Sequence, residues 1–95
     1  MNSIAQAQLE RLVSTINTLT GSPLKPYTQD PETKQVRSNT GNFHISSAYG
    51  GFNLERMSNT DGETETVFCC VHTTRLDLYY MMQAFILGLK FGKQA

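Results

Sequence analysis

The sequence predicts an α+β protein, a two-layer sandwich with an N-terminal helix, a three- or four-stranded antiparallel meander and a C-terminal helix. Three observations lead to this class. Apolar residues recur at helical spacing near the N-terminus, two turn signals interrupt alternating residues in the middle, and a nearly continuous apolar stretch follows. A chain of 95 residues can bury one modest core, so we expect one domain over residues 1–95.

The first predicted element is an amphipathic helix. Its apolar stripe consists of Ala5, Leu9, Leu12, Val13, Ile16 and Leu19. Asn2 or Ser3 is expected to cap its start. Gly21, followed by Pro23, is expected to end it.

The next segment, residues 21–42, is polar and rich in proline, threonine and asparagine. Within it, residues 30–33 (Asp-Pro-Glu-Thr) have the form of a turn. Residues 24–28 and 35–37 would then be two short extended pieces of an extra hairpin. An ordered loop is the alternative.

Two turn signals, Gly50-Gly51 and Asp61-Gly62, predict the central meander. A two-residue first turn gives the pairs Tyr49–Phe52, Ser47–Leu54 and Ile45–Arg56. A two-residue second turn gives Arg56–Val67, Leu54–Cys69 and Phe52–Val71. A four-residue first loop over residues 48–51 would keep every side chain on the same face, because the face depends only on parity.

Both turns therefore predict the same two faces of the sheet. The inner face is expected to carry Phe43, Ile45, Tyr49, Phe52, Leu54, Val67, Cys69 and Val71. The outer face is expected to carry His44, Ser46, Ala48, Asn53, Glu55, Met57, Thr66, Phe68, Cys70 and His72.

The last predicted element is a helix that starts near Thr73-Thr74, where Thr74 and Asp77 approximate a capping box. Residues 76–91 are apolar almost all round, and a polar stripe consists of Arg75, Gln83, Lys90 and the Tyr79 hydroxyl. A helix this apolar is covered on more than one side. The sheet and the first helix can cover two sides, and a second subunit would make the protein a homodimer.

Composition limits the partners. Eight basic residues balance eight acidic ones, so no bulk field draws the chain to nucleic acid, which remains a partner that is not favoured. The apolar run 76–89 is too short to span a bilayer, and the polar-interleaved N-terminus argues against a signal peptide. The adjacent Cys69 and Cys70 cannot form an undistorted disulfide on one strand, so we expect reduced thiols in the cytoplasm.

The outer face suggests either chemistry or a binding surface. His44, Glu55, Cys70 and His72 would be the residues of a small metal or acid/base site, but no second Cys or His pair completes a zinc set. We favour a half-polar contact surface. The candidate interaction surface consists of His44, Asn53, Glu55, Phe68, Cys70, His72, Tyr79 and Met82.

Arg56 is the one charged residue expected on the inner face, where a cation needs a partner. The available carboxylates are Glu10, Glu65 and Asp77, and we take Arg56 with Asp77 as the candidate ion pair. An anion site at the helix–sheet junction is the functional alternative. A structural arginine at a strand end, reaching solvent or a carboxylate, is favoured.

Several short series resemble small uncharacterised proteins encoded by bacteriophages and prophages. The series are Gly41-Asn42-Phe43-His44, Ala48-Tyr49-Gly50-Gly51 with Leu54 and Arg56, and the later Cys70, His72, Thr74, Arg75, Leu78-Tyr79 and Gly88-Leu89. This resemblance implies a phage-derived bacterial cytoplasmic protein, and it implies no activity and no catalytic residues.

Three hypotheses follow, in order of preference. The first is a non-enzymatic protein-binding or assembly module, with no cofactor and an unknown protein partner. The second is a nucleic-acid accessory protein of phage replication, in which Lys25, Lys34 and Arg37 surround a stacking Tyr27. The third is a metal-dependent enzyme built on His44, Glu55, Cys70 and His72, ranked last because two histidines make no convincing site. No phosphate loop or nucleophile elbow points to another enzyme class.

Overall fold

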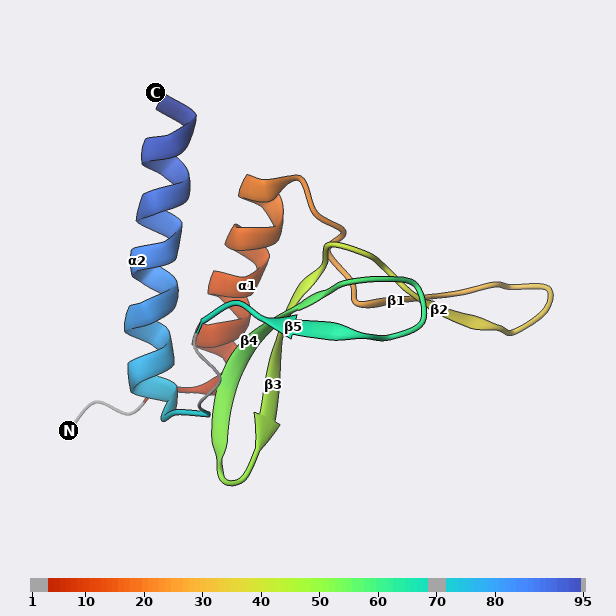
Figure 1. Ribbon diagram of the computed structural model, residues 1–95, viewed down its shortest axis with the longest axis horizontal. Coiled ribbons are helices and arrows are strands. Elements are labelled where there is room, and N and C mark those ends of the chain that lie inside the picture. The colour runs from red at the N-terminus through yellow and green to blue at the C-terminus, as the bar shows by residue number, and fades with distance from the viewer. Residues whose placement is uncertain (1–3, 69–71, 95) are drawn as a thin grey trace.

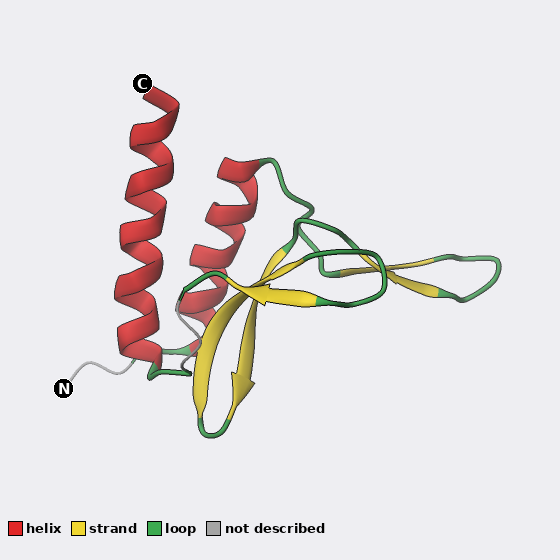
Figure 2. Ribbon diagram, in the orientation of Figure 1, coloured by secondary structure: helices red, strands yellow, loops and turns green. Residues whose placement is uncertain are grey.

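The computed structural model describes residues 4–68 and 72–94. Its elements are α1 (Gln6–Thr20), β1 (Tyr27–Gln29), β2 (Val36–Ser38), β3 (Phe43–Ala48), β4 (Gly51–Met57), β5 (Thr64–Thr66) and α2 (Arg75–Gln94). The strands form two antiparallel sheets, β1-β2 and β3-β4-β5, so the α+β class is confirmed (Figure 2).

The two helices run side by side in the same direction, next to the three-stranded sheet (Figure 1). The core lies between the helices and the sheet, and its buried members are Leu9, Val13, Ile16, Phe43, Leu54, Leu78, Met82 and Ile86. Helix α1 thus buries the stripe predicted for it, except that Ala5 is exposed.

Helix α1 ends as predicted but starts differently. Gly21 caps the C-terminus with a φ of 69°, in the left-handed region that glycine tolerates best. At the other end Ala5 is the cap residue, and its N–H donates to the Gln8 side chain at 2.8 Å. The predicted caps Asn2 and Ser3 lie outside the described residues.

The extra hairpin is present as β1 and β2, which form a sheet of their own and project away from the helices (Figure 1). The turn between them is organised by Asp30, whose carboxylate accepts the N–H groups of Glu32 at 2.8 Å and Thr33 at 3.3 Å. These backbone hydrogen bonds lower the pKa of Asp30 from its ordinary value of 3.8.

The lowered pKa of Asp30 predicts an acid-sensitive turn. Because the folded-state pKa lies below the unfolded one, the ionised carboxylate stabilises the turn at neutral pH, and this contribution is lost as the pH falls through the folded pKa. An NMR titration should show the Glu32 and Thr33 amides moving with a midpoint below 3.8. In Asp30→Asn, which keeps the acceptor oxygen, this transition should vanish; a midpoint at or above the ordinary value would contradict the assignment.

The first turn of the meander is one residue earlier than Gly50-Gly51. Tyr49 and Gly50 form the loop, with φ values of 54° and 75°, as a two-residue turn with both φ positive requires. The pairs predicted from a two-residue turn at Gly50-Gly51 are therefore wrong. Ser47 pairs with Phe52, as the alternative loop over residues 48–51 predicts. The side chains of β3 and β4 therefore stay on the faces predicted for them. Tyr49 is 99% exposed in the turn and does not lie on the inner face.

The second turn is wider than Asp61-Gly62. The Ser58 N–H donates to the Glu63 backbone carbonyl at 2.8 Å. Inside the loop, the Asn59 side-chain oxygen accepts the N–H groups of Asp61 and Glu63. Arg56 consequently pairs with Glu65, and the predicted Arg56–Val67 pairing is wrong.

Strand β5 is shorter than predicted. It ends at Thr66, Val67 still donates to the Leu54 carbonyl at 3.0 Å, and the next bridge joins Thr73 to Phe52. The predicted partners Cys69 and Val71, and the expectation of reduced thiols at Cys69 and Cys70, lie outside the described residues.

Helix α2 begins at Arg75, close to the predicted Thr73-Thr74 start. The Asp77 N–H donates to the Thr74 hydroxyl at 3.1 Å, which is the backbone half of the predicted box. The Asp77 carboxylate accepts from the Thr73 hydroxyl at 3.3 Å. No helix within the described part of the chain is long and apolar enough to cross a bilayer.

Candidate functional site

The candidate interaction surface predicted from the sequence does not form one patch. Asn53 is 1% exposed and Met82 is fully buried, so neither can meet a partner directly. Phe68 packs edge-on against Phe85 of α2, with ring centroids 5.8 Å apart, on the core side of the sheet. Phe68 leaves the outer face because the regular strand ends at Thr66, so alternation no longer fixes its direction. Cys70 lies outside the described residues.

The two histidines lie apart. His44 faces Glu55 across the β3–β4 ladder, with its Nε2 3.6 Å from the carboxylate. His72 lies against Gly51 and meets the Tyr49 ring at a centroid distance of 6.0 Å. Gly51 and Glu55 are four positions apart on β4, roughly 13 Å of strand. Within residues 4–68 and 72–94, no group of three or more His, Cys, Asp or Glu side chains could hold a metal ion.

The outer face of the sheet is not open along its whole length. Asn42, just before β3, and Met57 at the end of β4 are each 1% exposed. The Asn42 side-chain amide donates to the Pro23 carbonyl at 2.7 Å, which ties the segment before β1 to this end of the sheet. Asn53, nearer the other end of β4, is buried as well, so the outer face is not the open half-polar surface that the sequence predicts.

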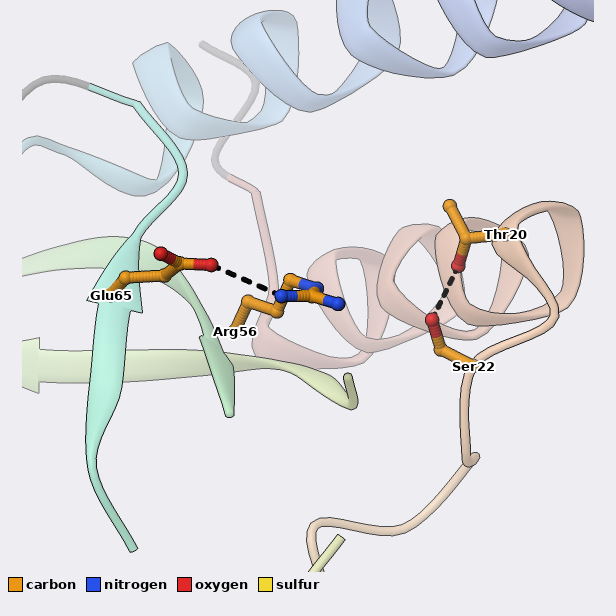
Figure 3. A network of polar contacts seen from close by, with 4 residues as sticks. All are labelled: Thr20, Ser22, Arg56 and Glu65. Atoms are coloured by element: carbon orange, nitrogen blue, oxygen red, sulfur yellow. Dashed lines mark hydrogen bonds and ion pairs between the residues drawn. The ribbon is translucent and has the colours of Figure 1, made fainter. Parts of the chain in front are cut away.

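Arg56 pairs with Glu65 at 3.1 Å and not with Asp77 (Figure 3). The predicted Arg56–Asp77 pair is wrong because β5 brings Glu65 directly opposite Arg56, while Asp77 is engaged at the start of α2. The guanidinium lies 5.9 Å from the centre of the Phe43 ring, and the side chains of the pair are 41% and 58% exposed. The favoured structural role, an arginine at a strand end that reaches a carboxylate, agrees with this geometry.

The hairpin does not assemble the predicted basic groove. Tyr27 pairs with Ser38 and Thr28 with Arg37. Adjacent residues of a strand point to opposite faces, so Tyr27 and Arg37 lie on opposite faces of the ribbon. Lys34 lies in the turn, with a φ of 64°. A base stacked on Tyr27 would therefore not lie on the face that carries Arg37.

The prediction that α2 is apolar on more than one side does not assign its residues to two separate stripes. Tyr79, one of the predicted surface residues, is half-buried against the core, and its hydroxyl accepts from Gln83 at 3.0 Å. The exposed apolar side chains lie on the opposite side of the helix from Leu78, Met82 and Ile86. They are Leu76 (39% exposed), Tyr80 (61%), Leu87 (55%) and Phe91 (68%), with Ala84 between them.

The spacing of this outer stripe could have identified it. The stripe consists of residues at intervals of four, four, three and four, the spacing of one face of a helix: 76, 80, 84, 87 and 91. The buried residues Leu78, Met82 and Ile86 lie about half a turn away. Two such stripes on one helix predict two packing partners. One partner is the body of this chain, and nothing among the described residues covers the other stripe.

A pocket of about 400 Å³ lies along β3, between α1 and the segment before β1. Its lining includes Glu10 of α1, Tyr27 of β1 and His44 of β3. Comparison of the chain with protein-family models, curated proteins and solved structures gives no match.

Proposed function

We propose that this chain is a non-enzymatic protein-binding or assembly module that associates with a second copy of itself through the outer stripe of α2. The exposure of that stripe is the observation that carries the proposal. Two aromatic and two leucine side chains stand in one row, between 39% and 68% exposed. Contiguous apolar surface of this kind is typical of an interaction site.

A second copy is the partner that fits the stripe. The apolar residues extend over most of the length of α2, and the small Ala84 lies in the middle of the row. Two such helices crossing antiparallel at Ala84 would approach closely there, and each would place its Tyr80 over Leu87 and Gly88 of the other copy. Such a contact uses the same patch on both subunits, as a two-fold dimer requires.

A phage or prophage setting and a cytoplasmic location are part of this proposal. The first rests on the resemblance of series such as Ala48-Tyr49-Gly50-Gly51 to phage-encoded proteins. The second rests on the thiols expected at Cys69 and Cys70. Purification of the partner complexes from an infected or lysogenic bacterium would test both.

Substitution of Leu87 by glutamate should dissociate the dimer. Leu87 is 55% exposed, so the fold tolerates the charge, whereas the dimer would bury it without a partner. We expect the dissociation constant of the dimer to rise at least about tenfold, which corresponds to a loss of about 1.4 kcal/mol of binding free energy. Light scattering coupled to size-exclusion chromatography measures the mass at several concentrations.

The matched control is Val36→Glu, which introduces the same charge at an apolar residue that is 62% exposed on the hairpin. This variant should retain the mass of the unmodified protein. A wild-type protein that stays monomeric at the highest attainable concentration would refute self-association.

A further inference from the structure

Strand β3 is an edge of the three-stranded sheet, and part of its backbone is already engaged in place of a neighbouring strand. The Phe43 N–H donates to the Asn17 side chain at 2.8 Å, and the Phe43 carbonyl accepts from it at 3.0 Å. Phe43 therefore turns its backbone groups away from β4. Because these directions alternate along an antiparallel strand, Ile45 and Ser47 turn theirs to the same outer side.

Strand β4 gives the same result independently. Leu54 and Phe52, the partners of Ile45 and Ser47, direct their backbone groups to the opposite side of the sheet. Leu54 accepts from Val67 at 3.0 Å, and Phe52 exchanges hydrogen bonds of 2.7 and 2.9 Å with Thr73. No residue in the described part of the chain bonds the outward N–H and carbonyl groups of Ile45 and Ser47.

The groove beside this edge is the pocket of about 400 Å³. Helix α1 forms one wall and the segment before β1 forms the other, with β3 at the base. The lining residues are Glu10, Val13, Leu24, Pro26, Tyr27, Asn42, Phe43, His44 and Ile45. Strand addition places an extended peptide against an exposed sheet edge, and β3 supplies such an edge beside this groove.

Two buried polar atoms in the groove lining lack hydrogen-bond partners among the described residues. Asn42 is 1% exposed, and its Oδ1 has no hydrogen bond; the 2.7 Å bond from its Nδ2 to Pro23 fixes which amide atom is which. The Nδ1 of His44 is also buried without a partner. Its other ring nitrogen, Nε2, lies 3.6 Å from the Glu55 carboxylate.

The charge of the groove favours a cation. Glu10 contributes a carboxylate to the lining, and Tyr27 contributes an aromatic ring that is 54% exposed. Carboxylates and the face of a tyrosine ring both attract a guanidinium or ammonium group. Arg56 lies over Phe43 but pairs with Glu65, which is outside the groove lining.

We infer that this groove binds an extended peptide segment of a partner protein, which adds as a strand to β3 at Ile45 and Ser47 and places a basic side chain near Glu10 and Tyr27. The backbone of the segment meets the unpaired edge, and the positive charge of its basic side chain complements the Glu10 carboxylate in the lining. This surface is distinct from the outer stripe of α2, so the inference goes beyond self-association and can fail independently of it.

The test is an NMR titration of the full chain with blocked pentapeptides. The probe is Thr-Val-Arg-Val-Thr, compared with the same peptide carrying glutamate in place of arginine. We expect the arginine peptide to shift the Ile45 and Ser47 amides and protect them from hydrogen exchange, and to bind at least about tenfold more tightly than the glutamate peptide. Equal binding of both peptides, or shifts confined to α2, would overturn the inference.

Two variants assign the contacts. The Ser47 N–H points away from β4, so Ser47→Pro removes it without removing a β3–β4 hydrogen bond. Proline is tolerated at such a position on an edge strand. This variant should abolish peptide binding. Glu10→Gln should reduce the preference for the arginine peptide, whereas Glu32→Gln at the exposed hairpin turn should leave it unchanged.

A probe change covers the case in which Ser47→Pro does not fold. Peptides methylated on the amide nitrogens that face β3 lose their donors while the protein stays unchanged, and they should not bind. Binding that survives this methylation would refute strand addition. Concentration-dependent shifts of Ile45 and Ser47 without peptide would instead assign the edge to a second copy and overturn the proposed partner.

Discussion

Replacement of Asn17 by leucine is expected to lower the free energy of unfolding by about 2–6 kcal/mol. The Asn17 side chain is fully buried, and it bonds both the N–H and the carbonyl of Phe43. Leucine has a similar size but leaves both backbone groups unsatisfied, and each such group costs about 1–3 kcal/mol. The total stability of a small domain is about 5–15 kcal/mol, so the variant should be close to its unfolding limit.

Urea denaturation followed by circular dichroism measures this loss. Ser14→Ala is the control, since Ser14 lies on the exposed side of the same helix and should change stability by less than about 0.5 kcal/mol. If Asn17→Leu unfolds at the same urea concentration as the control, the edge of β3 does not depend on this side chain.

Replacement of Gly51 by alanine is expected to destabilise the fold by about 1–3 kcal/mol, the usual cost of overpacking. A Cβ at this position would lie 2.9 Å from the backbone carbonyl carbon of His72 and 3.1 Å from its oxygen. The obstacle is backbone held by the Phe52–Thr73 bridge, so it cannot move aside as a flexible side chain would.

Gly88→Ala is the matched control for the monomer. Gly88 lies inside α2, and a Cβ there would have no heavy atom within 4 Å. The substitution should therefore stabilise the protein by about 0.5–1 kcal/mol through helix propensity. Thermal unfolding of both variants should shift in opposite directions, and a shift in the same direction would contradict the close approach of β4 and His72.

Much of the fold follows from local patterns in the sequence. The stripe of α1, the Gly21 cap and the hairpin around residues 30–33 are visible because each depends on neighbouring residues. The predicted faces of β3 and β4 are largely correct. The turn lies one residue earlier than predicted, which moves each β3 residue's partner by two positions and so leaves the side chains on the same face. The pairs themselves were wrong because Tyr49, a residue without special tolerance for positive φ, occupies the loop.

The candidate site was harder to predict because it depends on tertiary packing. Asn17 lies in an otherwise amphipathic helix, and its partner Phe43 is 26 residues away, so no local pattern marks it as an edge cap. Phe68 was assigned to the outer face by continuing a strand that ends at Thr66. The sequence predicts that α2 is apolar, but it places Tyr79 and Met82 on the surface, whereas Tyr80 and Leu87 are the exposed residues.

The bond between Asn17 and Phe43 also has a kinetic consequence. The tertiary bond from Asn17 of α1 forms only after the chain closes a loop of 26 residues, and Arg75 reaches the Ile4 carbonyl over 71 residues. Isolated helices of this length are marginal in water, and distant contacts slow the search for the native state. Folding should therefore be a single slow, concerted step, in which α1, the meander and α2 acquire protection from hydrogen exchange at one common rate.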